Sequence, residues 1–280
     1  MTKQKKYIIG ISLIVIVEGV IAYFIKTDMS AISEPYAKLN TIFGMTIPFN
    51  GINITTVLNT WLIMAVVLGV SVFTTSHLTP VPGRLQAMIE MYVMAFENLC
   101  CEVLGKERGR RYLPLVATLF ILVLLSNWIG IIPSFWQLFN GVFPHWLVIE
   151  EPTKDLNTTL GLGIMCFFIA HISGIYVKGV KSYLAEYFEP MVVIGKVRIP
   201  NLFMGVLNIV GEFGKTISHS FRLFGNILGG AIIILVISSL TKYIMLPVFL
   251  NAFFGLFVGA IQAFVFAMLA LVYISVMVND

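Results

Sequence analysis

The sequence predicts an all-α membrane protein with about six transmembrane helices, of which the last two form a long, tilted hairpin. Three observations lead to this fold class. Of the 280 residues, 58% are hydrophobic and only 11% are charged, whereas a soluble domain carries about 25% charged residues. The mean hydropathy of the chain is +0.93. Most apolar residues lie in runs long enough to cross a bilayer, which takes about 20 helical residues.

The charged residues and cysteines exclude several classes of site. The formal net charge is +4, but Lys and Arg also collect in the cytoplasmic loops of membrane proteins, so no nucleic-acid partner is predicted. The three cysteines (Cys100, Cys101 and Cys166) form no Cys-x-x-Cys pattern, so we predict neither a disulfide framework nor a metal site. No stretch repeats at a solenoid period, and we predict one membrane domain in three consecutive parts.

Residues 1–56 are predicted to form an N-terminal transmembrane helix and an external segment. The run Tyr7–Ile25 is apolar except for Ser12 and Glu18, and three lysines precede it. A signal peptide is the alternative, but its apolar region is only about 7–15 residues long, so we favour a helix that is retained. Glu18 has no visible partner and is expected to be protonated or to face an interface. The more polar residues 26–53 are expected to lie outside.

Residues 57–200 are predicted to hold three peripheral transmembrane helices and one amphipathic helix. The spans are expected at Val57–Phe73, Tyr112–Ile132 and Leu160–Val177. In residues 84–104, apolar side chains recur at helical spacing with three glutamates between them. This pattern predicts a helix that lies along the cytoplasmic face of the membrane or packs on other helices. The basic run 106–111 is interpreted as a solvated cytoplasmic loop.

Residues 201–280 are predicted to form a long helical hairpin. Its two apolar arms, Leu202–Leu240 and Pro247–Val278, are both longer than the roughly 20 residues that a simple crossing needs. The arms must therefore be tilted, curved or partly outside the membrane.

The positions of Lys and Arg set the predicted orientation. Most of them lie in the N-terminus, in residues 76–112 and in residues 178–198, while few lie in residues 26–56 and 134–155. Because positive residues are enriched in cytoplasmic loops, both termini are expected in the cytoplasm.

One arginine lies deep within the first arm of the hairpin. The stretch from His219 to Gly230 places Arg222 inside a long apolar run. A charged side chain at the bilayer centre costs about 2.5–3.5 kcal/mol on insertion scales, and a guanidinium group cannot lose its proton to avoid that cost. Such a residue normally faces a partner or a water-filled cavity, so Arg222 is a candidate functional residue.

Polar and small residues accompany Arg222 along one helical face. On each arm they recur at steps of three or four residues, which places them on a common side of a helix. They are Lys215, Ser218, Arg222, Asn226 and Gly229 on the first arm, and Asn251, Gly255, Gly259 and Gln262 on the second. Gly225 and Gly229 also form a Gly-x-x-x-Gly pair, for which helix packing alone is the simplest explanation. The interleaved polar groups instead favour a face that meets a moving, negatively charged partner.

Several separated motifs resemble those of subunit a of the F-type ATP synthases, the stator of a rotary membrane motor. The main motif is Phe221-Arg222-Leu223-Phe224-Gly225-Asn226, followed by Gln262-Ala263-Phe264-Val265-Phe266. Val81-Pro82-Gly83-Arg84-Leu85-Gln86, then Ser126-Asn127-Trp128 with Pro133, and then Asp155-Leu156-Asn157-Thr158-Thr159-Leu160 occur in the same order as in that family. The resemblance covers residues 50–280, so the span Tyr7–Ile25 is an addition relative to the shorter members.

The resemblance implies a non-catalytic, ion-translocating stator subunit in a bacterial plasma membrane. The hairpin is expected to face a rotating ring of c subunits, each with one membrane carboxylate. Two aqueous half-channels are expected to reach the ring from opposite sides. The other implied partners are the peripheral stalk b subunits, the rest of the ATP synthase complex and the lipid bilayer, and no covalently bound cofactor is expected.

The shared helical face and the resemblance together imply roles for individual residues. Arg222 is expected to be the essential stator arginine, which attracts an ionised ring carboxylate and displaces its cation. Ion translocation is expected to involve Arg222, Asn226, Gln262, Ser218, Lys215 and Asn127. Gly225, Gly229, Gly255 and Gly259 are expected to pack against the ring.

Three positions depart from the family pattern. Many members carry an ionisable residue nine residues after the arginine, a second one paired with it on the other arm, and an aspartate three residues after the asparagine of the third span. Here these positions are Ala231, Gly255 and Gly130. A proton can still move through ordered water, but a path without titrating groups is also one that hydrated Na⁺ uses. The transported cation is therefore Na⁺ or H⁺, with a slight preference for Na⁺.

A stand-alone secondary transporter or channel is the alternative function. It predicts inverted repeats around broken helices, and the sequence shows no internal repeat. A voltage sensor needs several arginines in one span, and here the span contains one, Arg222. An enzyme is not indicated either, because the sequence contains no HExxH, GxSxG or P-loop motif. A lone transporter is expected to be active by itself, whereas a stator subunit requires a c-ring and a peripheral stalk.

Overall fold

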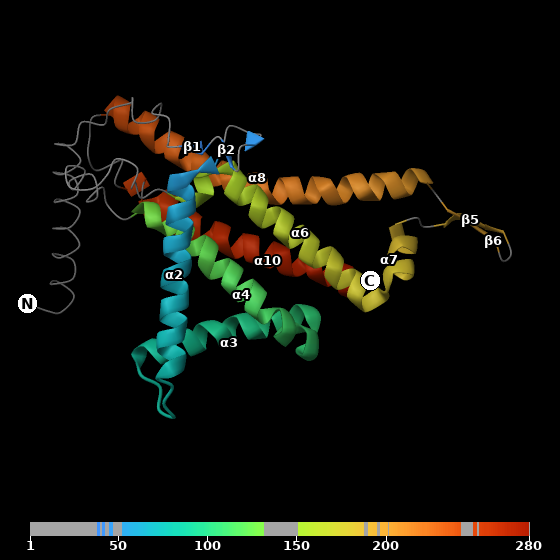
Figure 1. Cartoon of the computed structure of the whole chain (residues 1–280), viewed down its shortest axis with the longest axis horizontal. Coiled ribbons are helices and arrows are strands. Elements are labelled where there is room, and N and C mark those ends of the chain that lie inside the picture. Colours follow the sequence, from blue (N-terminus) through green and yellow to red (C-terminus); the bar gives the residue numbers. More distant parts are fainter. Residues whose placement is uncertain are drawn as a thin grey trace, which may run out of the picture. The chain divides into compact units, whose positions relative to one another are not determined.

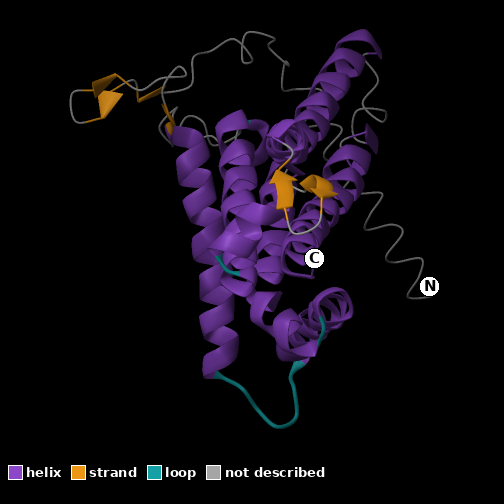
Figure 2. Cartoon of the chain, turned by 90° about the vertical axis from the view of Figure 1, so that its right-hand side faces the viewer, coloured by secondary structure: helices purple, strands orange, loops and turns teal. Residues whose placement is uncertain are grey.

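The computed structural model describes residues 52–131, 151–187, 190–194, 197–200, 202–241, 249–250 and 252–279, together with the strand segments 38–39, 41–42 and 45–46. Most of these residues are helical (Figure 1, Figure 2). The helices are α2 (Ile54–Ser76), α3 (Arg84–Leu104), α4 (Lys106–Trp128), α6 (Leu156–Lys178), α7 (Val180–Tyr187), α8 (Leu202–Thr241) and α10 (Gly259–Asn279). Two short 3₁₀ segments, η2 (Ile129–Ile131) and η3 (Pro152–Lys154), and one π-helical segment, η4 (Ala252–Val258), complete the helical elements described.

The strands form short antiparallel pairs. β1 (Lys38–Leu39) pairs with β4 (Ile52–Asn53), β2 (Thr41–Ile42) pairs with β3 (Met45–Thr46), and β5 (Pro190–Ile194) pairs with β6 (Val197–Pro200). The sequence interpretation did not foresee the β5–β6 hairpin, because it treated this stretch only as a polar, basic segment. The valines and isoleucines between residues 192 and 199 are β-branched and favour extended backbone.

Five of the described helices are long and apolar enough to cross a membrane. They span Thr55–Ser76, Lys106–Trp128, Leu156–Lys178, Gly205–Ile234 and Ala252–Val278. The all-α membrane fold is therefore confirmed, and five of the predicted spans have a counterpart among these helices. The predicted first span, Tyr7–Ile25, lies outside the described residues.

By its internal contacts the chain divides into two compact units. Unit 1 consists of Met1–Val66, Val123–Asp155 and Gly225–Gln262, and unit 2 consists of Val67–Leu122, Leu156–Phe224 and Ala263–Asp280. Because four of the unit boundaries fall within helices, α2, α4, α8 and α10 each contribute residues to both units. The units follow packing and not order along the chain, so the predicted division into residues 1–56, 57–200 and 201–280 stays a prediction.

In unit 2, α3 has the amphipathic character that its sequence predicted. The side chains of Phe96, Cys100 and Leu104 are buried, whereas Met88 and Met94 are 65% and 60% exposed. The bounds of the helix are also those predicted, Arg84 to Leu104. Its buried face follows the three- to four-residue spacing that places side chains on one side of a helix.

Aromatic contacts hold α3 against α4 within unit 2. The ring centroids of Phe96 and Phe120 are 4.9 Å apart, and the Tyr92 hydroxyl donates a hydrogen bond to the carbonyl oxygen of Ala117. Burial raises the pKa of Tyr92, with a smaller opposing effect of a backbone hydrogen bond at Ile121. The phenol therefore keeps its proton and stays a donor.

Two glycines join α3 to α4 without a loop. Gly105 has a φ of +79°, a backbone conformation that favours glycine and ends a helix. A Cβ at Gly109 would lie 2.7 Å from the carbonyl group of Cys100 and from the Cα of Cys101, so glycine lets the start of α4 approach the end of α3. The prediction of a solvated loop at residues 106–111 is wrong, because this basic run forms the first turns of α4.

In unit 1 the second arm of the hairpin contains a π-helical segment. The sequence predicted one regular span over Pro247–Val278, but η4 precedes α10, and π-helical turns are often found at functional sites. Two side chains from the end of α4 form hydrogen bonds with the backbone of this second arm. Trp128 Nε1 donates to the Leu256 carbonyl oxygen at 3.1 Å, and Asn127 Nδ2 donates to the Gly259 carbonyl oxygen at 2.9 Å.

Candidate functional site

One exposed face of α8 carries the polar residues that the sequence singled out. Lys215, Ser218, Arg222 and Asn226 are all exposed. His219, Ser220 and Leu223 between them are buried, as are Ile227 and Gly230 just after Asn226. Steps of three and four residues along a helix produce this separation of two faces. The shared face is therefore a feature of the fold, while the roles of its residues stay predictions.

Arg222 forms no ion pair and no hydrogen bond with any residue that the structure describes. The residue almost one turn earlier, His219, points the other way and is 2% exposed. Its ring stacks on Phe266, with 3.9 Å between centroids, and meets Tyr273 edge-on at 5.5 Å. Aromatic packing thus fixes this turn of α8 within unit 2 and leaves the guanidinium on the opposite, exposed side.

Lys215, in contrast, is paired. Its Nζ lies 2.6 Å from Glu212 Oε1, three residues earlier on α8. The sequence reasoning missed Glu212, although an acid three residues before a lysine is a recognised helical pair. Both residues line a cavity of about 340 Å³ in unit 2, together with Tyr183, Glu186 and Asn208 among others.

A buried tyrosine closes part of this unit 2 cavity. Tyr183 is 5% exposed, and its hydroxyl forms hydrogen bonds with His171 Nδ1 and with Met277 Sδ. A Cβ at Gly174 would lie 2.8 Å from the Tyr183 ring, so glycine makes room for the tyrosine. His171 therefore has a structural hydrogen-bond partner in Tyr183, a tyrosine that the sequence did not single out.

In unit 1, two of the predicted site residues bind each other. Asn226 Nδ2 donates a 2.7 Å hydrogen bond to Gln262 Oε1. Asn226 is exposed, whereas Gln262 is only 4% exposed. This contact joins the two arms of the hairpin one turn after the arginine along α8.

Asn127 uses both ends of its side-chain amide. It is 1% exposed. Its Nδ2 donates to the Gly259 carbonyl oxygen, and its Oδ1 accepts a 2.8 Å hydrogen bond from Thr153 Oγ1. One side chain therefore ties the end of α4 to the second arm and to η3, and its predicted part in ion translocation stays a prediction.

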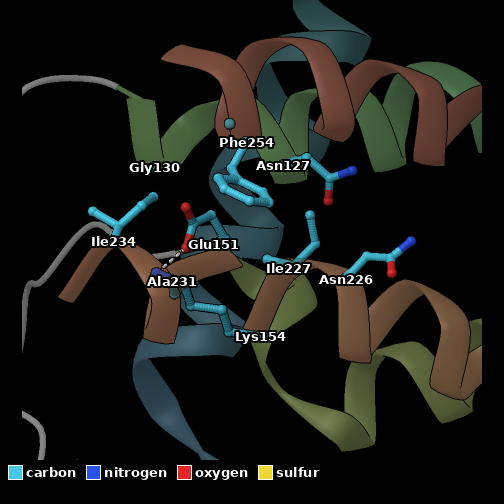
Figure 3. A pocket seen from close by; sticks show the side chains of 10 residues that line it. Asn127, Gly130, Glu151, Lys154, Asn226, Ile227, Ala231, Ile234 and Phe254 are labelled. Atoms are coloured by element: carbon cyan, nitrogen blue, oxygen red, sulfur yellow. Dashed lines mark ion pairs between the residues drawn. The ribbon is translucent and has the colours of Figure 1, made fainter. Parts of the chain in front are cut away.

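A second cavity, of about 190 Å³, lies within unit 1. Figure 3 shows the carboxylate of Glu151 and the ammonium stem of Lys154 among neutral side chains, with their ion pair drawn as a dashed line. The lining residues are Asn127, Gly130, Glu151, Lys154, Asn226, Ile227, Ala231, Ile234, Phe254 and Gly255. The structure thus brings together the three positions that depart from the family pattern, and it adds Glu151, which the sequence reasoning had treated only as part of an external loop.

The four glycines expected at the ring have different surroundings. A Cβ at Gly225 or Gly229 would meet nothing within 4 Å, whereas one at Gly259 would lie 3.2 Å from Asn127 Cβ. Gly259 therefore serves close packing within unit 1, and Gly255 lines the cavity there. Contact of these glycines with a ring stays a prediction.

The Asn226–Gln262 contact predicts unequal single substitutions. Asn226→Ala leaves the buried Gln262 oxygen without its donor, which costs about 1–3 kcal/mol, whereas Gln262→Ala leaves an exposed amide that water can solvate. We expect Asn226→Ala to lower the thermal stability of the purified protein more, and the double variant to be little worse than Asn226→Ala. The measurement is a double-mutant cycle on melting temperatures. Strictly additive losses would contradict a direct coupling.

Comparisons with known proteins agree on one family. A family profile described as "ATP synthase A chain" matches residues 57–275. The ATP synthase subunit a of Geotalea daltonii is 37% identical over 217 residues, which cover 77% of this chain and 84% of that protein. That of Moorella thermoacetica is 35% identical over 221 residues, 79% of this chain and 88% of the relative. That of Citrifermentans bemidjiense is 34% identical over 245 residues, 86% and 96% respectively.

Proposed function

The chain belongs to the ATP synthase A chain family, and on that premise we propose that it is the ion-translocating stator subunit a of a rotary F-type ATP synthase. Subunits of this family are non-catalytic membrane components, so ATP chemistry belongs to other subunits. In the proposal, the chain provides two half-channels and the arginine that exchanges Na⁺ or H⁺ with the carboxylates of a c-ring.

Arg222 is the observation that carries the proposal. It is exposed on a helix that is long and apolar enough to span a membrane, and it has no acidic partner among the described residues. A permanent positive charge in a span needs a partner or water. An ionised carboxylate on a neighbouring ring supplies the opposite charge, and a neutralised one does not, so the arginine distinguishes the two states of the ring.

The two cavities support the half-channel proposal. The unit 2 cavity is lined by Lys215 and the unit 1 cavity by Asn226. Along α8, Arg222 comes seven residues after Lys215 and four residues before Asn226. We assign Lys215 and Ser218 to one half-channel, and Asn226, Gln262 and Asn127 to the other. Gly225 and Gly229, which have open space around them, are assigned to the ring-facing surface, whereas the buried Gly259 packs against Asn127 and Gly255 lines the unit 1 cavity.

The proposed partners are the c-ring, the peripheral stalk b subunits and the remaining ATP synthase complex. The proposed location is a bacterial plasma membrane, with both termini in the cytoplasm. Na⁺ is slightly preferred over H⁺ as the transported ion, because positions 231 and 255 carry no ionisable side chain; the charged residues of the unit 1 cavity are Glu151 and Lys154.

One purification tests both the complex and its ion. A tag on this chain is expected to recover a c-ring, a stalk and ATP-hydrolysing subunits. Hydrolysis by this coupled complex is expected to rise when Na⁺ is added to a sodium-depleted, mildly alkaline medium, and Na⁺ is expected to protect the ring carboxylate from a carbodiimide. A rate of ATP hydrolysis that does not change when Na⁺ is added would identify H⁺ as the transported ion. Recovery of the chain without any ring, but with transport activity of its own, would reject the stator function.

A further inference from the structure

We propose that Glu151 is the cation-accepting carboxylate of the unit 1 cavity, and that Gly130 is the residue that makes room for it. This inference rests on the proposed function, because it names the group through which that cavity takes up the transported cation. It concerns the described residues of unit 1 alone.

The lining of the cavity singles out Glu151. Of the ten lining residues, only Glu151 and Lys154 carry a charge, and the others are neutral amides, apolar side chains or glycines. A cation that leaves bulk water for such a cavity loses hydration, and neutral groups compensate for only part of that loss. A carboxylate provides the missing negative charge, and the amides of Asn127 and Asn226 add polar groups beside it.

Glu151 and Gly130 fit each other sterically. A Cβ built on Gly130 would overlap Oε1 and Cδ of Glu151 and would come within 2.6 Å of its Cγ. The Glu151 side chain therefore fills the volume that any side chain at position 130 would need. Figure 3 shows its carboxylate between the backbone at Gly130 and the helix that carries Ala231. The Glu151 carboxylate can therefore occupy this position only because residue 130 has no side chain.

The backbone that carries Glu151 is held in place by buried contacts. Glu151 immediately precedes η3, in which Pro152 and Thr153 are buried. Thr153 is 0% exposed, and its hydroxyl donates to Asn127 at the end of α4. Because Asn127 is itself bonded to Gly259, the backbone that carries the carboxylate is fixed to the end of α4 and, through it, to the second arm of the hairpin.

Lys154 acts as the exchangeable counter-ion. It forms an ion pair with Glu151 Oε2, and its side chain is 33% exposed while that of Glu151 is 14% exposed. The ammonium can therefore move towards water while the carboxylate stays inside. An arriving Na⁺ or H⁺ takes the place of the ammonium at the carboxylate. The ammonium returns when the cation moves on. The net charge of Glu151, Lys154 and the bound cation together is therefore +1, against zero for the ion pair alone.

The test is passive ion flux through the membrane part of the complete complex after removal of its catalytic subunits. The flux is measured against the concentration of the transported ion, Na⁺ or H⁺, in membrane vesicles. Glu151→Gln is expected to raise the half-saturating concentration about tenfold, since one charged ligand is lost. Lys154→Gln is expected to lower it, because a competing cation is removed. Glu102→Gln, at an exposed acid on α3 that lines neither cavity, is the matched control and is expected to change nothing.

A relocated carboxylate separates ion binding from a purely structural ion pair. The double variant Gly130→Asp with Glu151→Ala returns a carboxylate to the same volume from the other element. It is expected to restore the half-saturating concentration to within about threefold of the original, whereas Glu151→Ala alone is expected to resemble Glu151→Gln.

The outcomes that overturn the inference are distinct from those that overturn the proposed function. An unchanged half-saturating concentration in Glu151→Gln rejects the inference. So does loss of assembled complex to an equal extent in Glu151→Gln and Lys154→Gln, with unchanged half-saturation of what remains, because that result assigns the pair a structural role. If vesicles with the original chain show no flux that depends on this subunit, the proposed function itself fails.

Discussion

Replacing Arg222 with alanine is expected to abolish ion-coupled ATP synthesis, while the complex still assembles. The side chain lies on the exposed face of α8 and forms no ion pair or hydrogen bond with the described residues, so its removal leaves no buried partner unsatisfied. In the proposed mechanism, the substitution removes the positive charge that attracts an ionised ring carboxylate and, with it, the barrier between the two half-channels. Synthesis and ATP-driven pumping in membrane vesicles measure the first loss, and a rise in passive ion leak measures the second.

Arg222→Lys is expected to fail nearly as completely, although it keeps the charge. An ammonium group is compact and strongly hydrated and lacks the planar fork of a guanidinium. Arg110→Ala is the matched control. Arg110 pairs with Glu97 at 2.7 Å, but its side chain is 73% exposed, and an exposed ion pair contributes little to stability because water screens it. Full ATP-driven pumping by Arg222→Ala membranes would refute the stator assignment.

Replacing Gly109 with alanine is expected to have the largest effect on assembly of the substitutions considered. The new Cβ would lie 2.7 Å from three backbone atoms of Cys100 and Cys101, and no rotation of a side chain relieves a clash with backbone. Overpacking of this kind costs about 1–3 kcal/mol. We expect the start of α4 to move away from the end of α3 and the amount of assembled complex to fall several-fold.

The thiol of Cys100 reports this displacement directly. Cys100 is 0% exposed, and burial, with a smaller effect of Cys101, raises its pKa to about 11. Below that pH the group stays a protonated, unreactive thiol in the original chain. In Gly109→Ala it is expected to gain solvent, so its pKa falls towards the ordinary value and its alkylation becomes faster, as located by mass spectrometry. Gly161→Ala is the control, because a Cβ there would meet nothing within 4 Å. Equal assembly of the two variants would show that α4 can shift without loss.

The long apolar elements could be predicted from the sequence because one physical signal defines them. The predicted bounds Arg84–Leu104 coincide with α3, and the predicted arm Leu202–Leu240 differs from α8 by one residue. In both stretches, hydrophobic spacing continues from end to end, and glycine, proline or polar residues lie beside the ends. The basic run after α3 was wrongly predicted to be a loop, because charged stretches are common in loops. Recognising Gly105 as a one-residue turn would have placed the run at the start of α4.

The candidate site was predictable along one helix but not between elements. Arg222 and Asn226 share a face of α8 because of helical periodicity alone, which a sequence displays. The meeting of Glu151 with Gly130 depends on how η3 returns to the end of α4, and neither residue signals the other in the sequence. From the sequence alone, Gly130 indicates only that an acidic side chain is missing at that position. The structure shows that the carboxylate of Glu151, from another segment, occupies the same volume.

The π-helical turns of η4 make chain length a determinant of the unit 1 cavity. A π-turn bonds residues five apart, and so accommodates more residues per turn than an α-helix. Deleting a single residue from Ala252–Val258 would let the segment relax to α-helical geometry, so that the chain on either side would keep nearly the same rotation about the helix axis while side chains within the segment would turn. Phe254, whose ring borders the cavity in Figure 3, would then point elsewhere although its identity is unchanged. Insertions and deletions here therefore alter the wall of the cavity in a way that no exchange of one side chain reproduces.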